Sequence, residues 1–244
     1  MFALLPGKSV EVYRRLFEAL VRECAQIDLI LQPDVLFMDH EIAPRNAARH
    51  VFPRTDVKAC FFHFAQCIWR KVQSCGLTEA YRTDENVHRL VRRAAVLPLV
   101  PIEAVEDVWF NALTDVGDLD LPAAVETFTD YVTEHWIEGE KEVWNHFSTH
   151  GPRTTNNLEG WHSMLKKVIY HPHPNIYSII RTLQEIESLS YIRQLQYSTG
   201  GTRPIKKRKY RNIDQQLVAM KGRLLDQTMT VVQYADACSY FVHL

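Results

Sequence analysis

In the first third of the chain, segments with the hydrophobic pattern of a helix alternate with segments that have the pattern of a strand. Residues 9–26 place Val12, Leu16 and Leu20 on one stripe, which predicts an amphipathic helix. Residues 35–38 are a short apolar run, and they predict a central strand that is buried on both faces. After this strand the pattern predicts helix, strand and helix over residues 43–51, 57–62 and 64–74. This alternation predicts an α/β layer.

The pattern becomes helical over residues 77–150. Pro98, Pro101 and Pro122 interrupt it, and the Pro98–Pro101 segment marks a turn because proline disrupts the interior of a helix. We therefore predict an all-helical insertion in this region. Further helices are predicted over residues 157–170, 175–196 and 213–241, with a flexible glycine joint near residue 200.

Length and composition narrow the class of protein. A chain of 244 residues with 46% hydrophobic content can bury one substantial core with an inserted subdomain. No apolar run approaches 18 residues, so no membrane span is predicted, and the first residues make a poor signal peptide. The five cysteines are scattered, which is more typical of a reducing compartment than of a disulfide framework.

Charge is segregated along the chain, although the net charge is only −1. Residues 103–142 contain twelve acidic side chains and one lysine, whereas residues 160–211 contain ten Lys or Arg and two Glu. Such segregation favours a surface for nucleic acid on the basic part of the chain. The alternative is that both parts are ordinary solvated faces.

Two acidic residues far apart in the sequence are candidates for chemistry. Asp39 follows the predicted strand at residues 35–38, and Glu159 lies in the first turn of a helix that Asn156 or Asn157 would cap. A strand-end aspartate and a helix-borne glutamate could together hold a divalent metal for phosphodiester chemistry. The alternative is that both carboxylates are solvated or structural.

Several segments, in order, resemble one known family. They are Pro33–Glu41, Ala47, Phe52–Pro53, Cys60–Phe64, Trp144–Asn145, Arg153–Asn157, Glu159–His162 and His173–Tyr177. Together they are similar to the Mutator-like element (MULE) transposase domain. The resemblance implies a ribonuclease H-like core, interrupted by an all-helical insertion. It also implies an Asp-Asp-Glu triad that binds two Mg²⁺ or Mn²⁺ ions and cuts DNA.

The resemblance assigns roles to particular residues. Asp39 would be the second aspartate and Glu159 the glutamate, both as catalytic metal ligands, with Cys60 and His63 on the active-site or DNA-end surface. The first segment, residues 1–8, resembles the end of the third core strand, so the family's first aspartate has no counterpart and the N-terminus is expected to be truncated. The chain would then be either a gene fragment or a product that no longer cuts DNA.

The same resemblance divides the chain into four parts. Residues 1–76 would begin the core, 77–150 would be the helical insertion, 151–197 would close the core with the third catalytic acid, and 198–244 would be a basic linker with a C-terminal helix. The expected partner is double-stranded DNA, as transposon ends and target, with a possible homodimer and a nuclear location. The rival interpretation is a non-catalytic DNA-binding or regulatory protein derived from a transposase.

Candidate DNA contacts come from basic, amide and aromatic side chains. They are Arg153, Asn156, Asn157, Trp144, Lys166, Lys167, Lys206, Lys207, Arg208 and Lys209. Trp144 could stack on an extruded base, although its default role is core packing. The basic run at residues 206–209 could bind phosphates or act as a nuclear import signal. The alternative is that it is only a solvated helix end with no binding role.

A zinc site is a further alternative that the sequence leaves open. Cys60 and His63 have zinc-like spacing, and His162, His171 or His173 could complete a set of four ligands. A structural zinc usually shows a second close pair of ligands, and the proline between His171 and His173 limits their geometry. Even so, a zinc-dependent interaction module is a third class of function for this chain.

Overall fold

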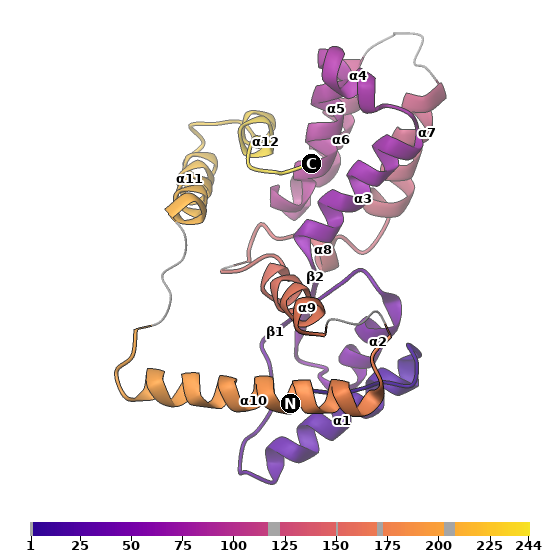
Figure 1. The fold of residues 1–244 in the computed structure, drawn as a ribbon. Coiled ribbons are helices and arrows are strands. Elements are labelled where there is room, and N and C mark those ends of the chain that lie inside the picture. The colour runs from indigo at the N-terminus through magenta and orange to yellow at the C-terminus, as the bar shows by residue number, and fades with distance from the viewer. Residues whose placement is uncertain (1, 117–122, 150, 170–172, 203–207) are drawn as a thin grey trace.

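The computed structural model describes residues 2–116, 123–149, 151–169, 173–202 and 208–244 (Figure 1). The described chain is mostly helical, with one small sheet of two parallel strands. A mixed α/β architecture agrees with this arrangement. The ribonuclease H-like core stays a prediction, because two strands do not define it. Among the helices that the structure places, none combines the length and apolar character that a membrane span requires.

The N-terminal part of the chain forms the sheet and two helices beside it. Helix α1 (Val10–Ala25) begins at Ser9, whose hydroxyl accepts a hydrogen bond from the Val12 amide, and it packs against α2 (Ile42–Val51). Strand β1 (Val35–Met38) pairs in parallel with β2 (Asp56–Ala59), so that Met38 lies opposite Ala59. The predicted strand at residues 35–38 is confirmed.

Two predictions about this sheet are wrong. Strand β1 is not buried on both faces: Val35 is 42% exposed and the other three residues are half-buried, because a sheet of two strands has little to cover it. The second strand does not continue to residue 62. Helix α3 (Phe61–Ser74) begins there, because Phe64, Ile68 and Val72 recur at helical spacing and are fully buried against the helical part of the chain.

The described residues between 77 and 149 contain helices and no strand. These are α4 (Thr78–Thr83), α5 (Glu85–Val96), η1 (Leu97–Leu99), η2 (Ile102–Ala104), α6 (Val105–Val116), α7 (Ala123–Val132), the π-helical turn η3 (Thr133–Ile137) and α8 (Lys141–Trp144). Together with α3 they enclose the main hydrophobic core, in which Trp109 and Phe128 are among the largest fully buried side chains.

Four helices follow: α9 (Asn156–Val168), α10 (Ile176–Ser198), α11 (Arg208–Leu225) and α12 (Val231–Ser239). The predicted single helix over residues 213–241 is therefore wrong. It breaks after Leu225, where Gln227 adopts a left-handed conformation with φ of 56° and Thr230 caps the next helix. The break lets α12 turn back onto α5.

Helix α12 is an integral part of the helical core. The Tyr234 hydroxyl donates to the Leu99 carbonyl at 3.0 Å, and Ala235 and Cys238 are fully buried. The Arg93 side chain, only 4% exposed, lies between Asp115 of α6 and Asp236 of α12, at 2.6 and 2.7 Å. These contacts attach the C-terminal residues to a helical unit that lies about 120 to 145 positions earlier in the chain.

Candidate functional site

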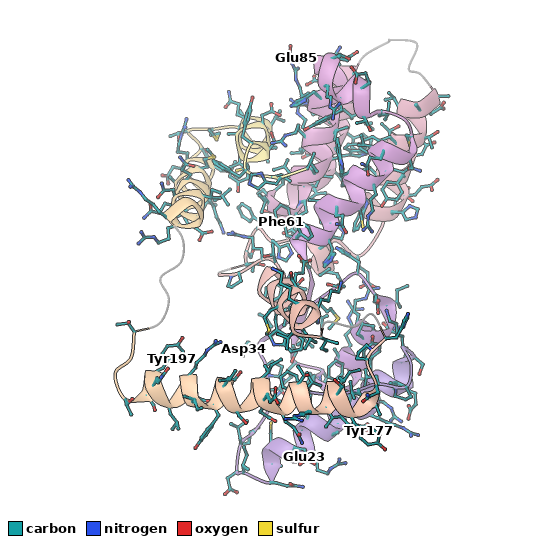
Figure 2. All side chains as sticks on the ribbon, viewed as in Figure 1. Glu23, Asp34, Phe61, Glu85, Tyr177 and Tyr197 are labelled. Atoms are coloured by element: carbon teal, nitrogen blue, oxygen red, sulfur yellow. The ribbon has the colours of Figure 1, made fainter. Side chains whose placement is uncertain are left out.

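Three segments meet beside the end of the sheet: the residues after β1, the junction of β2 with α3, and the residues that lead into α9. The Cys60 amide donates to the Met38 carbonyl at 2.8 Å, which joins the first two segments. The Phe61 amide donates to the Arg153 carbonyl at 2.9 Å, which joins the second to the third. Figure 2 labels Phe61 at this junction, between the helical unit and the sheet.

The imidazole of His63 lies between the two candidate carboxylates. Its Nδ1 is 3.0 Å from Asp39 Oδ1, and its Nε2 is 3.3 Å from Glu159 Oε1. The side chains of Asp39 and Glu159 are 57% and 40% exposed, and that of His63 is 24% exposed. Although 120 positions separate them in the sequence, Asp39 and Glu159 therefore converge on one ring.

The contact between His63 and Asp39 is close without being a directed hydrogen bond. Nδ1 of His63 is buried and has no hydrogen-bond partner, even though Asp39 Oδ1 lies within ion-pair distance of it. Such an N–H is misaligned with the carboxylate oxygen and gains little from it. The carboxylate of Asp39 is thus held near the ring and still has an exposed oxygen face for another ligand.

Cys60 holds the start of α9 in place. Its buried Sγ accepts hydrogen bonds from both the amide and the hydroxyl of Thr155, each at 3.2 Å. The Thr155 carbonyl in turn accepts from the Glu159 amide at 3.1 Å. Thr155 is the N-cap of α9, so the prediction that Asn156 or Asn157 caps the helix is wrong: both fall inside the helix, and the Thr155 hydroxyl is already bonded to the sulfur.

Two histidines that were not among the predicted site residues, the half-buried His40 and the buried His146, contact the backbone at the end of β2. Burial lowers the pKa of His40 to about 4, although a bond to the Cys60 backbone opposes that shift. Burial likewise lowers the pKa of His146 to about 4, with an opposing bond to the Ala59 backbone. The ring of His146 is neutral: Nε2 donates to the Ala59 carbonyl at 2.8 Å, and Nδ1 accepts from the Thr149 hydroxyl. Their adjacency to Asp39 and to the Trp144-Asn145 pair was the available signal in the sequence.

The comparison with protein families bears on this site. Residues 1–67 match the MULE transposase domain. The resemblance that the sequence motifs indicated is confirmed over this segment, which contains Asp39, Cys60 and His63. No curated protein and no solved structure matches the chain significantly.

Glu159 lies outside the segment that matches the MULE domain. It is the fold, through the Cys60–Thr155 contact, that brings Glu159 to the matched segment. In the part of the chain that the structure describes, no group of three or more His, Cys, Asp or Glu side chains is arranged to hold a metal. The zinc alternative stays open: Cys60 Sγ accepts hydrogen bonds from Thr155, and His171 lies outside the described residues.

Trp144 lies in the core of the protein and not on a DNA-facing surface. It is 3% exposed, and its ring centroid is 5.2 Å from that of Phe64 and 6.3 Å from that of Trp136. Neither face of its ring is open to a base in this structure. The position fits the alternative of core packing, which the Asn145 side chain reinforces by donating to the Val100 carbonyl at 2.8 Å.

The basic candidates occupy different places. Lys166 and Lys167 are exposed at the end of α9, and Arg208 is exposed at the start of α11. Arg153 is half-buried beside a cavity of about 290 Å³, whose other cationic lining residue is Lys221 of α11. Lys206 and Lys207 lie outside the described residues, as do the side chains of Asn156, Asn157 and Lys209.

Proposed function

We propose that this chain is a MULE-type DNA transposase domain, whose chemistry is metal-dependent cleavage and transfer of DNA strands on a ribonuclease H-like core. The observation that carries the proposal is the convergence of Asp39, from the segment that matches the family, with Glu159 from α9 on opposite sides of His63. Two carboxylates that far apart in sequence do not meet through local structure, so the contact reflects the fold.

The chemistry of the two carboxylates suits Mg²⁺ or Mn²⁺. Both ions prefer oxygen ligands, and Mg²⁺ keeps several waters, so two partly exposed carboxylates are a suitable protein contribution. Asp39 and Glu159 would be the ligands. When bound, such ions activate the attacking oxygen and stabilise the leaving oxygen in an in-line displacement at phosphorus.

The neighbouring residues would position these ligands. Cys60 fixes the first turn of α9 through Thr155. Asp39 directly follows β1, whose last carbonyl accepts from the Cys60 amide, and His40 contacts the Cys60 backbone. The His63 imidazole lies between the two carboxylates, with Nδ1 near Asp39 and Nε2 near Glu159. This geometry supports the proposal that Asp39 and Glu159 are the two ligands.

The proposed partners are transposon ends and target sites in double-stranded DNA, bound in the nucleus, with a homodimer as the assembled form. The exposed Lys166, Lys167 and Arg208 would contact phosphates. The second candidate function is a non-catalytic DNA-binding or regulatory protein. It is favoured by one observation, namely that no three-ligand group is assembled within the described ranges.

A cleavage assay tests the assigned site. The purified 244-residue chain should bind duplex DNA and fail to nick or join it efficiently with Mg²⁺ or Mn²⁺, because the resemblance supplies only two of three carboxylates. Efficient nicking that Glu159→Gln abolishes would mean that another acidic residue completes the triad. Asp34 and Glu41 would be examined first. Nicking that survives Glu159→Gln and Asp39→Asn would overturn the assigned site.

The basic run at residues 206–209 gives a second test. Each phosphate contact contributes about −0.9 to the slope of log binding constant against log salt. Alanine at Lys206, Lys207, Arg208 and Lys209 should flatten that slope by up to about three to four units. Binding should weaken about equally for all sequences.

Alanine at the exposed Arg15 and Arg22 of α1 is the matched control and should leave the slope unchanged. Thermal stability should be nearly unaltered in both variants, because exposed charges contribute little to folding. An unaltered salt slope in the quadruple variant would remove the run from the DNA surface and favour nuclear import as its role.

A further inference from the structure

Helix α10 is the longest helix among the described residues and the least covered. Of its 23 residues only Leu183 is buried. Its first half touches the N-terminal segment, where Phe2 and Leu4 line a groove together with Ile180 and Leu183. Figure 1 shows the C-terminal half extending past α1 and α9, and Figure 2 labels Tyr197 close to its free end.

This C-terminal half is unusually apolar for a helix in water. Its large exposed side chains are Leu189, Tyr191, Ile192 and Leu195, which are 56, 62, 50 and 46% exposed. Between residues 188 and 198 the only charged side chain is Arg193. Leu189 and Ile192 are three positions apart and share one face of the helix, whereas Tyr191 and Leu195 lie toward the other side. Exposed apolar side chains that share a face favour an interaction surface, because leaving them in water is unfavourable.

The charged residues on the Leu189 face of α10 would be complementary between two antiparallel copies of the helix. Glu185, Leu189 and Arg193 follow one another at intervals of four residues, so they share one face of the helix, and Ile192 lies beside Leu189 on the same face. If a second α10 runs antiparallel with Leu189 opposite Leu189, then Glu185 of each copy lies opposite Arg193 of the other. A parallel pairing would instead place like charges together.

We propose that the C-terminal half of α10 is a self-association surface on which a second copy of this chain binds antiparallel, with Leu189 at the two-fold axis. Such an interface is isologous, so the contact between Glu185 and Arg193 occurs twice. Glu185 also contacts Arg181 of its own chain at 3.2 Å, but both side chains are largely exposed and this pair exchanges at little cost.

The association is expected to be weak by itself. One pair of half-helices buries less than the roughly 1,600 Å² of a standard interface, so a dissociation constant on the order of micromolar is expected. The inference does not depend on the Asp39–Glu159 site, because none of its residues belongs to that site. Failure of DNA cleavage and failure of dimerisation are therefore separate results.

Sedimentation velocity of the full chain, over a concentration series to about 100 μM, tests the surface directly. The wild type should shift from monomer to dimer, and Leu189→Glu should remain monomeric. Glu185→Arg and Arg193→Glu should each weaken association about tenfold. The double exchange of both residues should restore it, because each new pair is again complementary. Val218→Glu, at a residue of α11 that is 68% exposed, is the matched control and should dimerise as the wild type does.

Three results would overturn the proposal. They are a wild-type chain that stays monomeric throughout the series, a dimer that survives Leu189→Glu, and a charge exchange that fails to restore the loss caused by its single variants. Circular dichroism of each variant shows that α10 is still helical. Because Leu189 is more than half exposed, its replacement should not unfold the chain.

Discussion

Replacement of Glu159 with glutamine is expected to weaken Mn²⁺ binding to this protein by more than about tenfold, and by up to about a hundredfold. Replacing a residue that only supports a metal ligand typically costs this much, so loss of a ligand itself should cost at least the same. The amide keeps the size of the side chain and removes its charge. The measurement is a Mn²⁺ titration followed by electron paramagnetic resonance, without DNA, so that it does not depend on cleavage.

Glu41→Gln is the matched control for that titration. Glu41 is two residues from Asp39, yet its carboxylate pairs with Lys8 at 3.2 Å and accepts from the Tyr13 hydroxyl at 3.5 Å. This variant should bind Mn²⁺ as the wild type does, whereas Asp39→Asn should behave like Glu159→Gln. If all three variants bind Mn²⁺ equally well, Asp39 and Glu159 are not metal ligands, and the non-catalytic alternative becomes the better one.

Acidification is expected to destabilise the protein strongly between about pH 6.5 and pH 4. His146 is 1% exposed and its pKa is about 4 in the folded chain, whereas an unfolded histidine has a pKa of about 6.5. The unfolded state therefore binds more protons across this interval, so stability is complete above the unfolded pKa and is lost as the pH falls toward the folded pKa. His146 alone should remove about 2 kcal/mol at pH 5 and about 3 kcal/mol at pH 4.

His40 should add to this effect, because burial lowers its pKa in the same direction. Urea unfolding at pH 7 and at pH 5 measures the combined change. His146→Gln should lower stability at pH 7, because it loses the bond to the Ala59 carbonyl, and it should make the dependence on pH distinctly shallower. A variant with an unchanged pH dependence would show that His146 does not titrate between the folded and unfolded states.

The sequence by itself determined where several local elements begin or end. Ser9 sets the start of α1, the apolar run sets β1 to the residue, and Asn175 sets the start of α10, because each signal involves contacts within a few positions. The motifs before residue 67 also indicated a resemblance to the MULE transposase domain, and residues 1–67 match that domain. Such features can be predicted from one sequence, since periodicity and capping are local.

Only the tertiary structure decided how distant segments combine. It placed His63 between Asp39 and Glu159, used the Cys60 sulfur to hold Thr155, and buried Trp144 against Phe64. It also divided the predicted last helix, so that Asp236 could reach Arg93. The partners in most of these contacts lie about 80 to 145 positions apart, and their choice depends on which surfaces bury the most apolar area together. Periodicity shows that a face will be buried but not what it will be buried against.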